Sequence, residues 1–250
     1  MRIPPECGKL FVGWCGDISS IARINDLLMS QPIYEEATTR VLSDSMAGKV
    51  VEARLAHVFN SFDNVLVTTS FGTTSALLLH IISRVRPGHP IHFINTGYHF
   101  DKTLDYKEKL TRRLGLNLVE VYPEEWRHDF TERDETWNKD PDFCCQINKV
   151  EPLERIKKEH DIWVSGLLGY QSNQRSQYRI IEEQSGVYKC YPLIDWSKSL
   201  VEDYFAQYGL PRHPLEPLGY ESIGCTHCTK PGCGRGGRWP GQSKNECGLH

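Results

Sequence analysis

Residues 65–75 read VLVTTSFGTTS, and this stretch decides the fold. Its first five residues are apolar or β-branched, which is typical of a buried strand. They lead into a turn that contains one glycine and several hydroxyl side chains, and a helical pattern that is apolar on almost every side follows at 76–82. A buried strand, a turn and a buried helix in this order predict the first half of a parallel β-α-β unit.

The same alternation continues along the chain. The further candidates are strands at 91–94, 117–121 and 162–165, and helices at about 101–114 and 196–208. The first three strands start 26 residues apart, which fits one strand, one crossover helix and two short loops. Ser199 and Glu202 have the spacing of a capping box at the start of the last helix. We therefore expect an α/β fold with an open, mainly parallel twisted sheet and helices on both faces.

The composition divides the chain into three parts. Residues 1–60 hold two helical patterns, at about Ile18–Met29 and Ser45–Phe59, and no motif. Residues 61–218 carry the α/β pattern of a nucleotide-binding domain. Residues 219–250 form an irregular tail in which 8 of 32 residues are Gly and 4 are Cys. Because this tail has no apolar periodicity, it cannot build a core of its own and must be held by other contacts.

Charge and composition exclude several classes of protein. The chain has 29 Lys and Arg against 32 Asp and Glu, a net charge of −3, so it lacks the basic excess of a nucleic-acid-binding protein. Hydrophobic residues make up 39% of the chain, enough for an ordinary globular core. No apolar run near the start is long enough for a signal peptide or a spanning helix, so we expect a soluble cytoplasmic protein without a membrane partner.

The turn at residues 70–75 is a candidate site for phosphate or sulfate. Unpaired backbone N–H groups and the dipole of the following helix attract an anion, and Gly72 lets the anion approach the backbone. Ligands of open α/β sheets bind outside the carboxyl ends of the strands, and Thr96 and Gly97 end the next strand at the same edge. The alternative interpretation is an ordinary helix cap. Thr74 stands where related loops that split ATP carry Asp, which fits a substrate without β- and γ-phosphates.

The nine cysteines indicate metal or redox chemistry in a reducing compartment, because their number is odd and several are close in sequence. Cys144-Cys145 and Cys225-x-x-Cys228 provide four thiols in two pairs. Four thiolates suit either tetrahedral zinc or an iron–sulfur cluster. The adjacent doublet favours a cluster with several irons, since its two sulfurs need not reach one ion. Buried structural thiols remain the alternative.

The C-terminus carries a candidate nucleophile. Cys247 is followed by glycine on a segment with little reason to be rigid, and Arg235, Arg238 and Lys244 lie just upstream. Nearby cations lower the pKa of a thiol and thereby activate it. An incidental terminal thiol is the alternative.

Together these motifs resemble those of the assimilatory sulfonucleotide reductases, and most of all those that act on adenosine 5′-phosphosulfate with an iron–sulfur cluster. The matching residues are Ser-Phe-Gly at 70–72, Asn-Thr-Gly at 95–97, Asp140-Pro141-x-x-Cys144-Cys145, Lys149-Val150-Glu151-Pro152-Leu153, Gly219-Tyr220-x-Ser222-Ile223-Gly224-Cys225-x-x-Cys228-Thr229-x-Pro231, Arg235-x-Gly237-Arg238-Trp239 and Glu246-Cys247-Gly248-Leu249-His250. The resemblance implies a fold like that of the adenine nucleotide alpha hydrolases.

The resemblance also implies a site and a reaction. A 4Fe-4S cluster would be held by Cys144, Cys145, Cys225 and Cys228, and Cys247 would attack the sulfur of adenosine 5′-phosphosulfate. AMP then leaves, and thioredoxin or a glutaredoxin-like dithiol releases sulfite from the enzyme S-sulfocysteine. Because a dianionic phosphosulfate repels a thiolate, the site needs fixed cations. The expected substrate-binding residues are Ser70, Phe71, Gly72, Thr73, Ser75, Thr96, Gly97, Lys149, Arg235, Arg238 and His250. We also expect a homo-oligomer.

Three features depart from the family pattern. Leu168-Gly169 replaces two arginines, Asn95 replaces an aspartate, and the segment between Cys228 and Arg235 is short and contains Cys233. Arg175 or Arg179 is a candidate to replace the missing charge. These departures keep two alternatives open. One is a paralogue that acts on the 3′-phosphorylated substrate or on another adenylylated or sulfonylated anion. The other is a non-catalytic iron–sulfur sensor that binds nucleotide.

Overall fold

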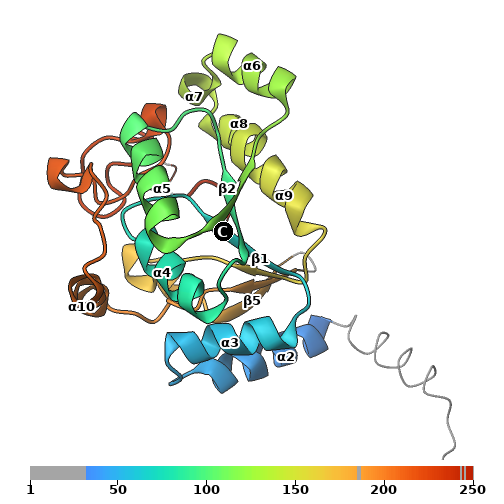
Figure 1. Cartoon of the computed structure of the whole chain (residues 1–250). Helices are drawn as coiled ribbons and strands as arrows, with labels where there is room; N and C mark the ends of the chain where they lie inside the picture. The colour runs from blue at the N-terminus through green and yellow to red at the C-terminus, as the bar shows by residue number, and fades with distance from the viewer. Residues whose placement is uncertain (1–31, 185–186, 243, 245, 250) are drawn as a thin grey trace, which may run out of the picture.

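The computed structural model describes residues 32–184, 187–242, 244 and 246–249. They contain a six-stranded sheet with the order β3-β2-β1-β4-β6-β5 (Figure 1). The strands are β1 Val65–Thr69, β2 Pro90–Ile94, β3 Asn117–Val121, β4 Ile162–Val164, β5 Ile181–Gln184 and β6 Val187–Cys190. All neighbours pair in parallel except β5, which runs antiparallel to β6 at the edge. The expected α/β fold with a mainly parallel sheet is therefore confirmed.

Helices connect the strands and form both outer layers. The α-helices are α2 Pro32–Met46, α3 Val51–Ser61, α4 Ser75–Val85, α5 Asp101–Leu114, α6 Glu125–Arg133, α7 Thr136–Lys139, α8 Pro141–Cys145, α9 Glu151–Lys157 and α10 Lys198–Tyr208. A π-helical turn, η1, covers Gln146–Val150, and 3-10 turns lie at η2 Gly169–Gln171, η3 Arg175–Gln177, η4 Glu216–Leu218 and η5 Thr226–Cys228. Within the described ranges no helix is both long and apolar enough to cross a membrane.

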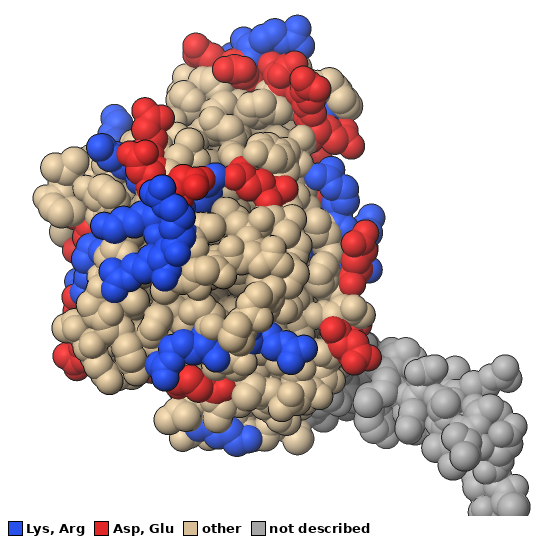
Figure 2. Space-filling model, viewed as in Figure 1, with Lys and Arg blue, Asp and Glu red and all other residues tan. Residues whose placement is uncertain are grey.

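The alternation of side chains in β1 creates two cores. Val65 and Val67 pack on one face against α3, α4, α5 and α10, in the main hydrophobic cluster. Leu66 points to the other face, where it packs with Trp163 of β4 and with Leu153 of α9. This period of two places helices on both faces of the sheet. The basic side of α5 lies in solvent, with acidic side chains nearby (Figure 2).

The sequence predicted most of the sheet and missed its last edge. β1 and β3 have the expected bounds, β2 and β4 differ by one residue at one end, and α5 is as expected. β5 and β6 were not predicted. β5 is an edge strand, and with charged residues such as Glu182 and Glu183 it lacks the apolar signal of a buried strand.

Two helix boundaries differ from the expectation, and one expected helix cannot be compared. The helix expected at Ser45–Phe59 is wrong, because α2 ends at Met46 and the chain turns at Gly48, with φ +74°, before α3 begins. The N-cap of α10 is Ser197, whose hydroxyl accepts from the Leu200 N–H, in place of the expected capping box at Ser199. The pattern at Ile18–Met29 lies outside the described residues.

The strand order fixes where a ligand binds. The chain runs from β1 outward through β2 and β3, and then returns to place β4 on the other side of β1. The loops that follow β1 and β4 therefore leave the sheet in opposite directions and open a crevice at their carboxyl ends. In open α/β sheets this switch point is the usual ligand site.

One buried arginine fastens the N-terminal helices to the end of the sheet. Arg54 of α3 is only 4% exposed and forms a bidentate ion pair with Asp195, at 2.7 and 2.6 Å. It also donates to the carbonyls of Pro192 and Met46, at 2.8 and 3.1 Å. Replacement of Arg54 would leave these acceptors without a partner.

We predict that Arg54→Ala lowers the free energy of unfolding by about 2–4 kcal/mol, the range for loss of a buried charged hydrogen-bonding group. Urea unfolding of wild type and variant measures the difference. Arg86→Ala, which truncates an exposed arginine, is the control and should change stability by less than about 0.5 kcal/mol. Equal effects of the two substitutions would contradict a fastening role for Arg54.

Candidate functional site

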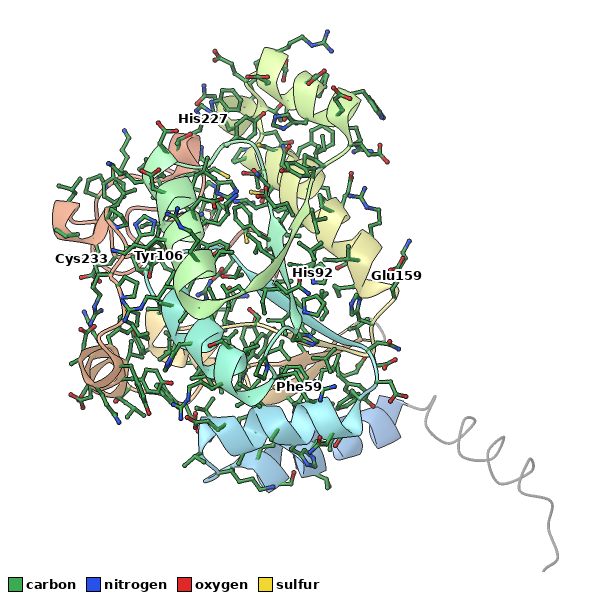
Figure 3. All side chains as sticks on the ribbon, in the orientation of Figure 1. Phe59, His92, Tyr106, Glu159, His227 and Cys233 are labelled. Carbon is green, nitrogen blue, oxygen red and sulfur yellow. The ribbon has the colours of Figure 1, made fainter. Side chains whose placement is uncertain are left out.

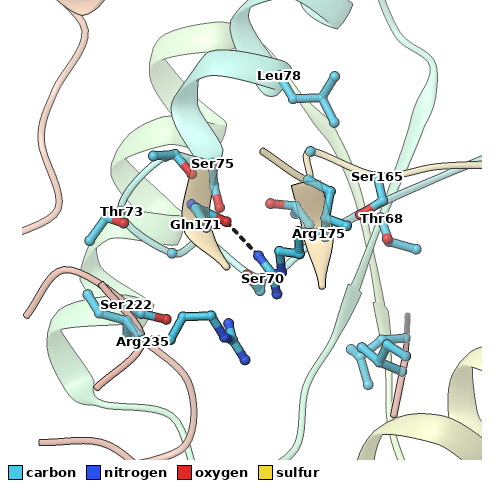
Figure 4. Close-up of a pocket in the computed structure, with 18 of the residues that line it drawn as sticks. Thr68, Ser70, Thr73, Ser75, Leu78, Ser165, Gln171, Arg175, Ser222 and Arg235 are labelled. Carbon is cyan, nitrogen blue, oxygen red and sulfur yellow. Dashed lines mark hydrogen bonds between the residues drawn. The ribbon is translucent and has the colours of Figure 1, made fainter. Parts of the chain in front are cut away.

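A cavity of about 180 Å³ opens at the carboxyl ends of β1 and β4 (Figure 4). Four parts of the chain form its walls: the turn after β1, the loop after β4, the segment with η2 and η3, and the C-terminal tail. Of the residues expected to bind substrate, those that line it are Ser70, Gly72, Thr73, Ser75, Arg235 and Arg238. The cavity thus lies at the switch point of the sheet and combines hydroxyl side chains with arginines.

The turn after β1 presents its backbone to this cavity. Thr74 is the N-cap residue of α4, and its side chain makes no capping hydrogen bond. Two of the first N–H groups of the helix are used within the turn, because Ser75 donates to the Gly72 carbonyl and Leu77 to the Thr74 carbonyl, both at 3.1 Å. The side chains of Ser70, Thr73 and Ser75 line the cavity beside this turn and bring hydroxyl groups to it. The ring of Phe71 is fully buried and packs against Phe93 with centroids 5.3 Å apart, so it does not line the cavity, and the expected contact of Phe71 with substrate stays a prediction. This packing holds Phe71 at φ +48° and so sets the shape of the turn.

Three arginines supply the positive charge of the cavity. Arg175 and Arg235 extend towards the same space in Figure 4, and Arg238 lies beside them. Burial and the neighbouring Arg175 lower the pKa of Arg235 to about 10, which shows how closely the cations crowd. Of the two arginines considered as replacements for the missing pair, Arg175 lines the cavity and Arg179 does not. An anion in the cavity would relieve the repulsion between these guanidinium groups.

The departure at Leu168-Gly169 has a structural reason. Leu168 is fully buried in the main core. A Cβ atom on Gly169 would lie 2.6 Å from the carbonyl oxygen of Ile194, so a larger residue does not fit without backbone movement. These two positions therefore belong to the core, and the neighbours Gly166 and Leu167 line the cavity instead.

The four cysteines of the two pairs meet beside the cavity, and all are buried. Cys144 and Cys225 pack together with Tyr98, while Cys145 and Cys228 pack with Trp239. Trp137 contacts both groups. Its indole stacks on His227, with centroids 3.8 Å apart (Figure 3), and this aromatic pair covers the thiols.

Burial and mutual repulsion disfavour ionisation of these thiols. Burial, followed by Cys145, Cys225 and Cys228, raises the pKa of Cys144 to about 12. Burial and Cys225 raise the pKa of Cys228 to about 11. Cys225 differs, because Lys149, the Thr96 hydroxyl and Arg238 outweigh its burial and lower its pKa. Four thiolates in this place need additional positive charge from a bound group.

A π-helical turn follows the cysteine doublet and brings Asn148 and Lys149 back to it. Asn148 donates to the Cys144 carbonyl at 3.0 Å and lies 3.7 Å from the Cys144 sulfur. Lys149 is half-buried, and although burial opposes its charge, Cys225, Cys145 and Cys247 hold its pKa above the ordinary value. π-helical turns inside helices are frequent at functional sites because they re-aim side chains.

Thr96, Gly97 and Lys149 lie on the cysteine side of the site. The residues that line the cavity do not include them, so their expected direct contact with substrate there is not seen. Thr96 is buried, and its hydroxyl lies 3.4 Å from the Cys225 sulfur. Gly97 has φ +74°, and a Cβ atom there would lie 2.8 Å from the ring of His128, so only glycine fits. His250 lies outside the described residues.

Cys247 lies between the two parts of the site. Its side chain is half-buried and packs against the group of Cys145, Cys228 and Trp239. The residues on either side of it reach the cavity: Glu246 pairs with Arg175 and Arg235, and Leu249 forms part of the lining. The thiol therefore stands where the arginine-lined cavity meets the four buried cysteines.

Sequence reasoning missed several lining residues. Ser165, Gly166 and Leu167 follow β4, and the rule that ligands bind at the carboxyl ends of strands would have found them. Gln171 also lines the cavity and belongs to none of the motifs. Glu246, which pairs with two lining arginines, was recognised only as part of the terminal motif. A second cavity of about 520 Å³ shares Thr73, Gln171 and Arg235 with the first. Cys233 is exposed at its edge (Figure 3).

Comparison with known proteins shows which proteins this chain is similar to. The model of the phosphoadenosine phosphosulfate reductase domain matches residues 64–231. The adenosine 5′-phosphosulfate reductase of Bacillus mycoides strain KBAB4 is 35% identical over 206 residues, which cover 78% of this chain and 88% of that protein. The enzyme of the same name from Halalkalibacterium halodurans is 37% identical over 199 residues, 75% of this chain and 85% of that one. A crystal structure of phosphoadenylyl-sulfate reductase from Candida auris in a phosphate complex superposes with a TM-score of 0.67 at 28% identity, over 77% and 96% of the two chains.

The departure at Asn95 is explained by its neighbour on β3. The Asn95 amide donates to Glu120 at 2.7 Å, and Glu120 also accepts from Lys107 and from Tyr122. Despite burial, the bonds from Lys107, Tyr122 and Asn95 lower the pKa of Glu120 to about 2. An aspartate at position 95 would place a second carboxylate against this one.

We predict that Asn95→Asp destabilises the fold by about 1–3 kcal/mol at pH 7, because a donor to a buried carboxylate becomes a like charge. The pair would take up a proton more readily in the folded than in the unfolded chain, so the loss should shrink as the pH falls from 7 to 4. Urea unfolding at both pH values measures this, with Asn117→Asp at an exposed position as the control. A loss that stays constant with pH would contradict the repulsion.

Proposed function

Because the chain belongs to the phosphoadenosine phosphosulfate reductase domain family, we propose that it reduces adenosine 5′-phosphosulfate to sulfite and AMP in sulfate assimilation. The observation that carries the proposal is the position of Cys247. Its thiol packs against the buried cysteines, and its neighbours in sequence reach the arginine-lined cavity. The proposed reaction needs a thiol nucleophile and a positively charged cavity that binds the anionic substrate.

In the proposed first step the Cys247 thiolate attacks the sulfur of the phosphosulfate. An S–S bond forms, the S–O bond to the phosphate breaks, and its electron pair stays on AMP. Arg175, Arg235 and Arg238 line the cavity and offset the charge of the phosphosulfate, while Lys149 stands near Cys247. These cations reduce the repulsion between two anions that must approach each other.

In the proposed second step a dithiol protein, thioredoxin or a glutaredoxin-like reductant, attacks the sulfur of Cys247. The S–S bond breaks, sulfite leaves with its electron pair, and a mixed disulfide forms. The second thiol of the reductant then releases Cys247 and leaves the reductant oxidised. We place the reaction in the cytoplasm, since the seven described cysteines are all free, as in a reducing compartment. A homo-oligomer is also part of the proposal.

The cysteine site fits a 4Fe-4S cluster on Cys144, Cys145, Cys225 and Cys228. The adjacent Cys144-Cys145 doublet favours a cluster over zinc, because its two sulfurs need not reach one ion. In a cluster each thiolate takes a different iron. The buried Trp239 indole N–H has no acceptor among the described residues and lies in the same group as Cys145 and Cys228. When bound, the cluster supplies positive iron charge, which keeps the four thiols ionised, and sulfide acceptors for nearby donors.

The relatives support the unphosphorylated substrate over its 3′-phosphorylated form. The two bacterial proteins at 35% and 37% identity carry the name of adenosine 5′-phosphosulfate reductase. All four cluster cysteines are present, as the resemblance to enzymes of that substrate requires. A comparison of the two nucleotides as substrates decides between them, since the 3′-phosphate is their sole difference.

We predict that anaerobically purified protein mixed with adenosine 5′-phosphosulfate, without reductant, gains the mass of one SO3 group on the peptide that contains Cys247. Intact and peptide mass spectrometry measure the product, and Cys247→Ser should give none. Cys233→Ser, which removes an exposed thiol, is the matched control and should still form the adduct. Both variants should keep the iron content of the wild type. An adduct on another cysteine, or sulfite release by Cys247→Ser, would refute the proposal.

We predict that Lys149→Met slows adduct formation by about 10²- to 10³-fold, the usual effect of removing one preorganised charge at a reacting anion. The reason is that Lys149 is the cation nearest in sequence to the cysteine doublet and interacts with Cys247. Single-turnover mixing with quenched mass spectrometry measures the rate. The exposed Lys158→Met is the control and should react like wild type. A Lys149→Met rate within threefold of wild type would remove this lysine from the mechanism.

A further inference from the structure

The residue before Cys247 makes an unusually well-held ion pair. Glu246 Oε1 accepts from Arg175 Nε at 2.8 Å, and Oε2 accepts from Arg175 Nη2 at 2.9 Å. Arg235 Nη2 approaches Oε2 at 3.0 Å. The side chains of Glu246 and Arg175 are each 10% exposed, and that of Arg235 is 12% exposed. Such a bidentate, largely buried pair has a defined geometry, in contrast to an exposed salt bridge.

Compared with the other contacts of the C-terminal tail, the Glu246 ion pair is the main polar contact that holds the tail next to the Cys247 thiol. Lys244 pairs with Asp142, which is 82% exposed, so this contact is weak. Leu249 packs against the apolar group of Leu66 and Trp163, and its carbonyl accepts from Lys189 at 3.2 Å. Between these two contacts the chain includes Gly248, with φ +84°. A segment with glycine at this point needs a fixed neighbour if Cys247 is to keep one position.

We propose that Glu246 is a positioning residue for the reaction. Its carboxylate, held by Arg175 and Arg235, latches the C-terminal tail against the cavity and thereby places Cys247 for attack on the bound anion. The same contact orients the two arginines, since Arg175 also donates to the side chain of Gln171 (Figure 4). This role rests on the proposed function for its chemical step, whereas the latch itself is a property of the protein without substrate.

The first test measures the latch without nucleotide. Iodoacetamide modifies Cys247 of the anaerobic holoprotein, and peptide mass spectrometry follows the rate for wild type, Glu246→Gln, Glu246→Asp and Glu154→Gln. Glu246→Gln should react about 10- to 100-fold faster, as expected when a buried charged hydrogen-bonding pair is lost. Glu246→Asp keeps the charge and should fall in between. Glu154→Gln removes an exposed carboxylate that pairs with the buried Lys157 on α9, and it should match wild type. Equal rates for wild type and Glu246→Gln would overturn the latch.

The second test measures the chemistry with adenosine 5′-phosphosulfate in single turnovers. Glu246→Gln should form the Cys247 adduct about 10- to 100-fold more slowly, with an apparent Kd changed by less than about threefold. Release of sulfite from the preformed adduct by thioredoxin should not slow, because the reductant needs the tail to open. A changed Kd with an unchanged adduct rate would overturn the positioning role. A raised Kd would make Glu246 a part of the anion site, and a lowered Kd would make it a competitor of the anion. If wild type forms no adduct, the proposed function fails, while the iodoacetamide rates still decide the latch.

Discussion

Burial of four thiols in one place is the constraint on which the rest of the site depends. The cysteines come from α8 and from the tail, and neither part would hold this position alone. The tail lacks an apolar core, so it docks through Cys225, Cys228 and Trp239 onto the doublet and its aromatic cover. Because burial raises the pKa of Cys144 and Cys228, nearby positive charge is needed to ionise them. Lys149 is one source of such charge, since it is among the groups that lower the pKa of Cys225, and the proposed cluster would be another.

The same docking brings the cations of the tail to the sheet. Arg235 and Arg238 lie between Cys228 and Cys247 in sequence, so a tail anchored at its cysteines delivers both arginines to the cavity. Arg238 also lies over the Trp239 ring, 4.5 Å from its centroid, which links the cavity to the buried thiols. The packing of the tail cysteines therefore also sets the charge of the cavity. Loss of the cysteine contacts would move Arg235 and Arg238 away from the place where the proposed phosphosulfate substrate needs positive charge.

Much of the fold and of the candidate site could be predicted from the sequence, but different signals predicted different parts. Buried strands such as β1 have a local apolar signal, and the cysteine pairs have a spacing that indicates a cluster. β5, the π-helical turn and the packing of Phe71 have no such signal, because each depends on neighbours distant in sequence. The pair between Arg175 and Glu246 joins residues 71 positions apart, and no local pattern indicates it. Each of the two residues could be singled out from the sequence, but their contact could not be predicted, because it exists only in the folded chain.

The departures from the family pattern show which residues provide the positive charge of the cavity in this chain. Positions 168 and 169 cannot carry arginines into the cavity, since one side chain fills the core and the other would strike the Ile194 carbonyl. The positive charge instead comes from Arg175, on the next short helical turn, and from the tail. Arg175 lines the cavity and also binds Glu246, the residue before Cys247. Under the proposed function, binding of the substrate anion and placement of Cys247 would both depend on this one guanidinium group.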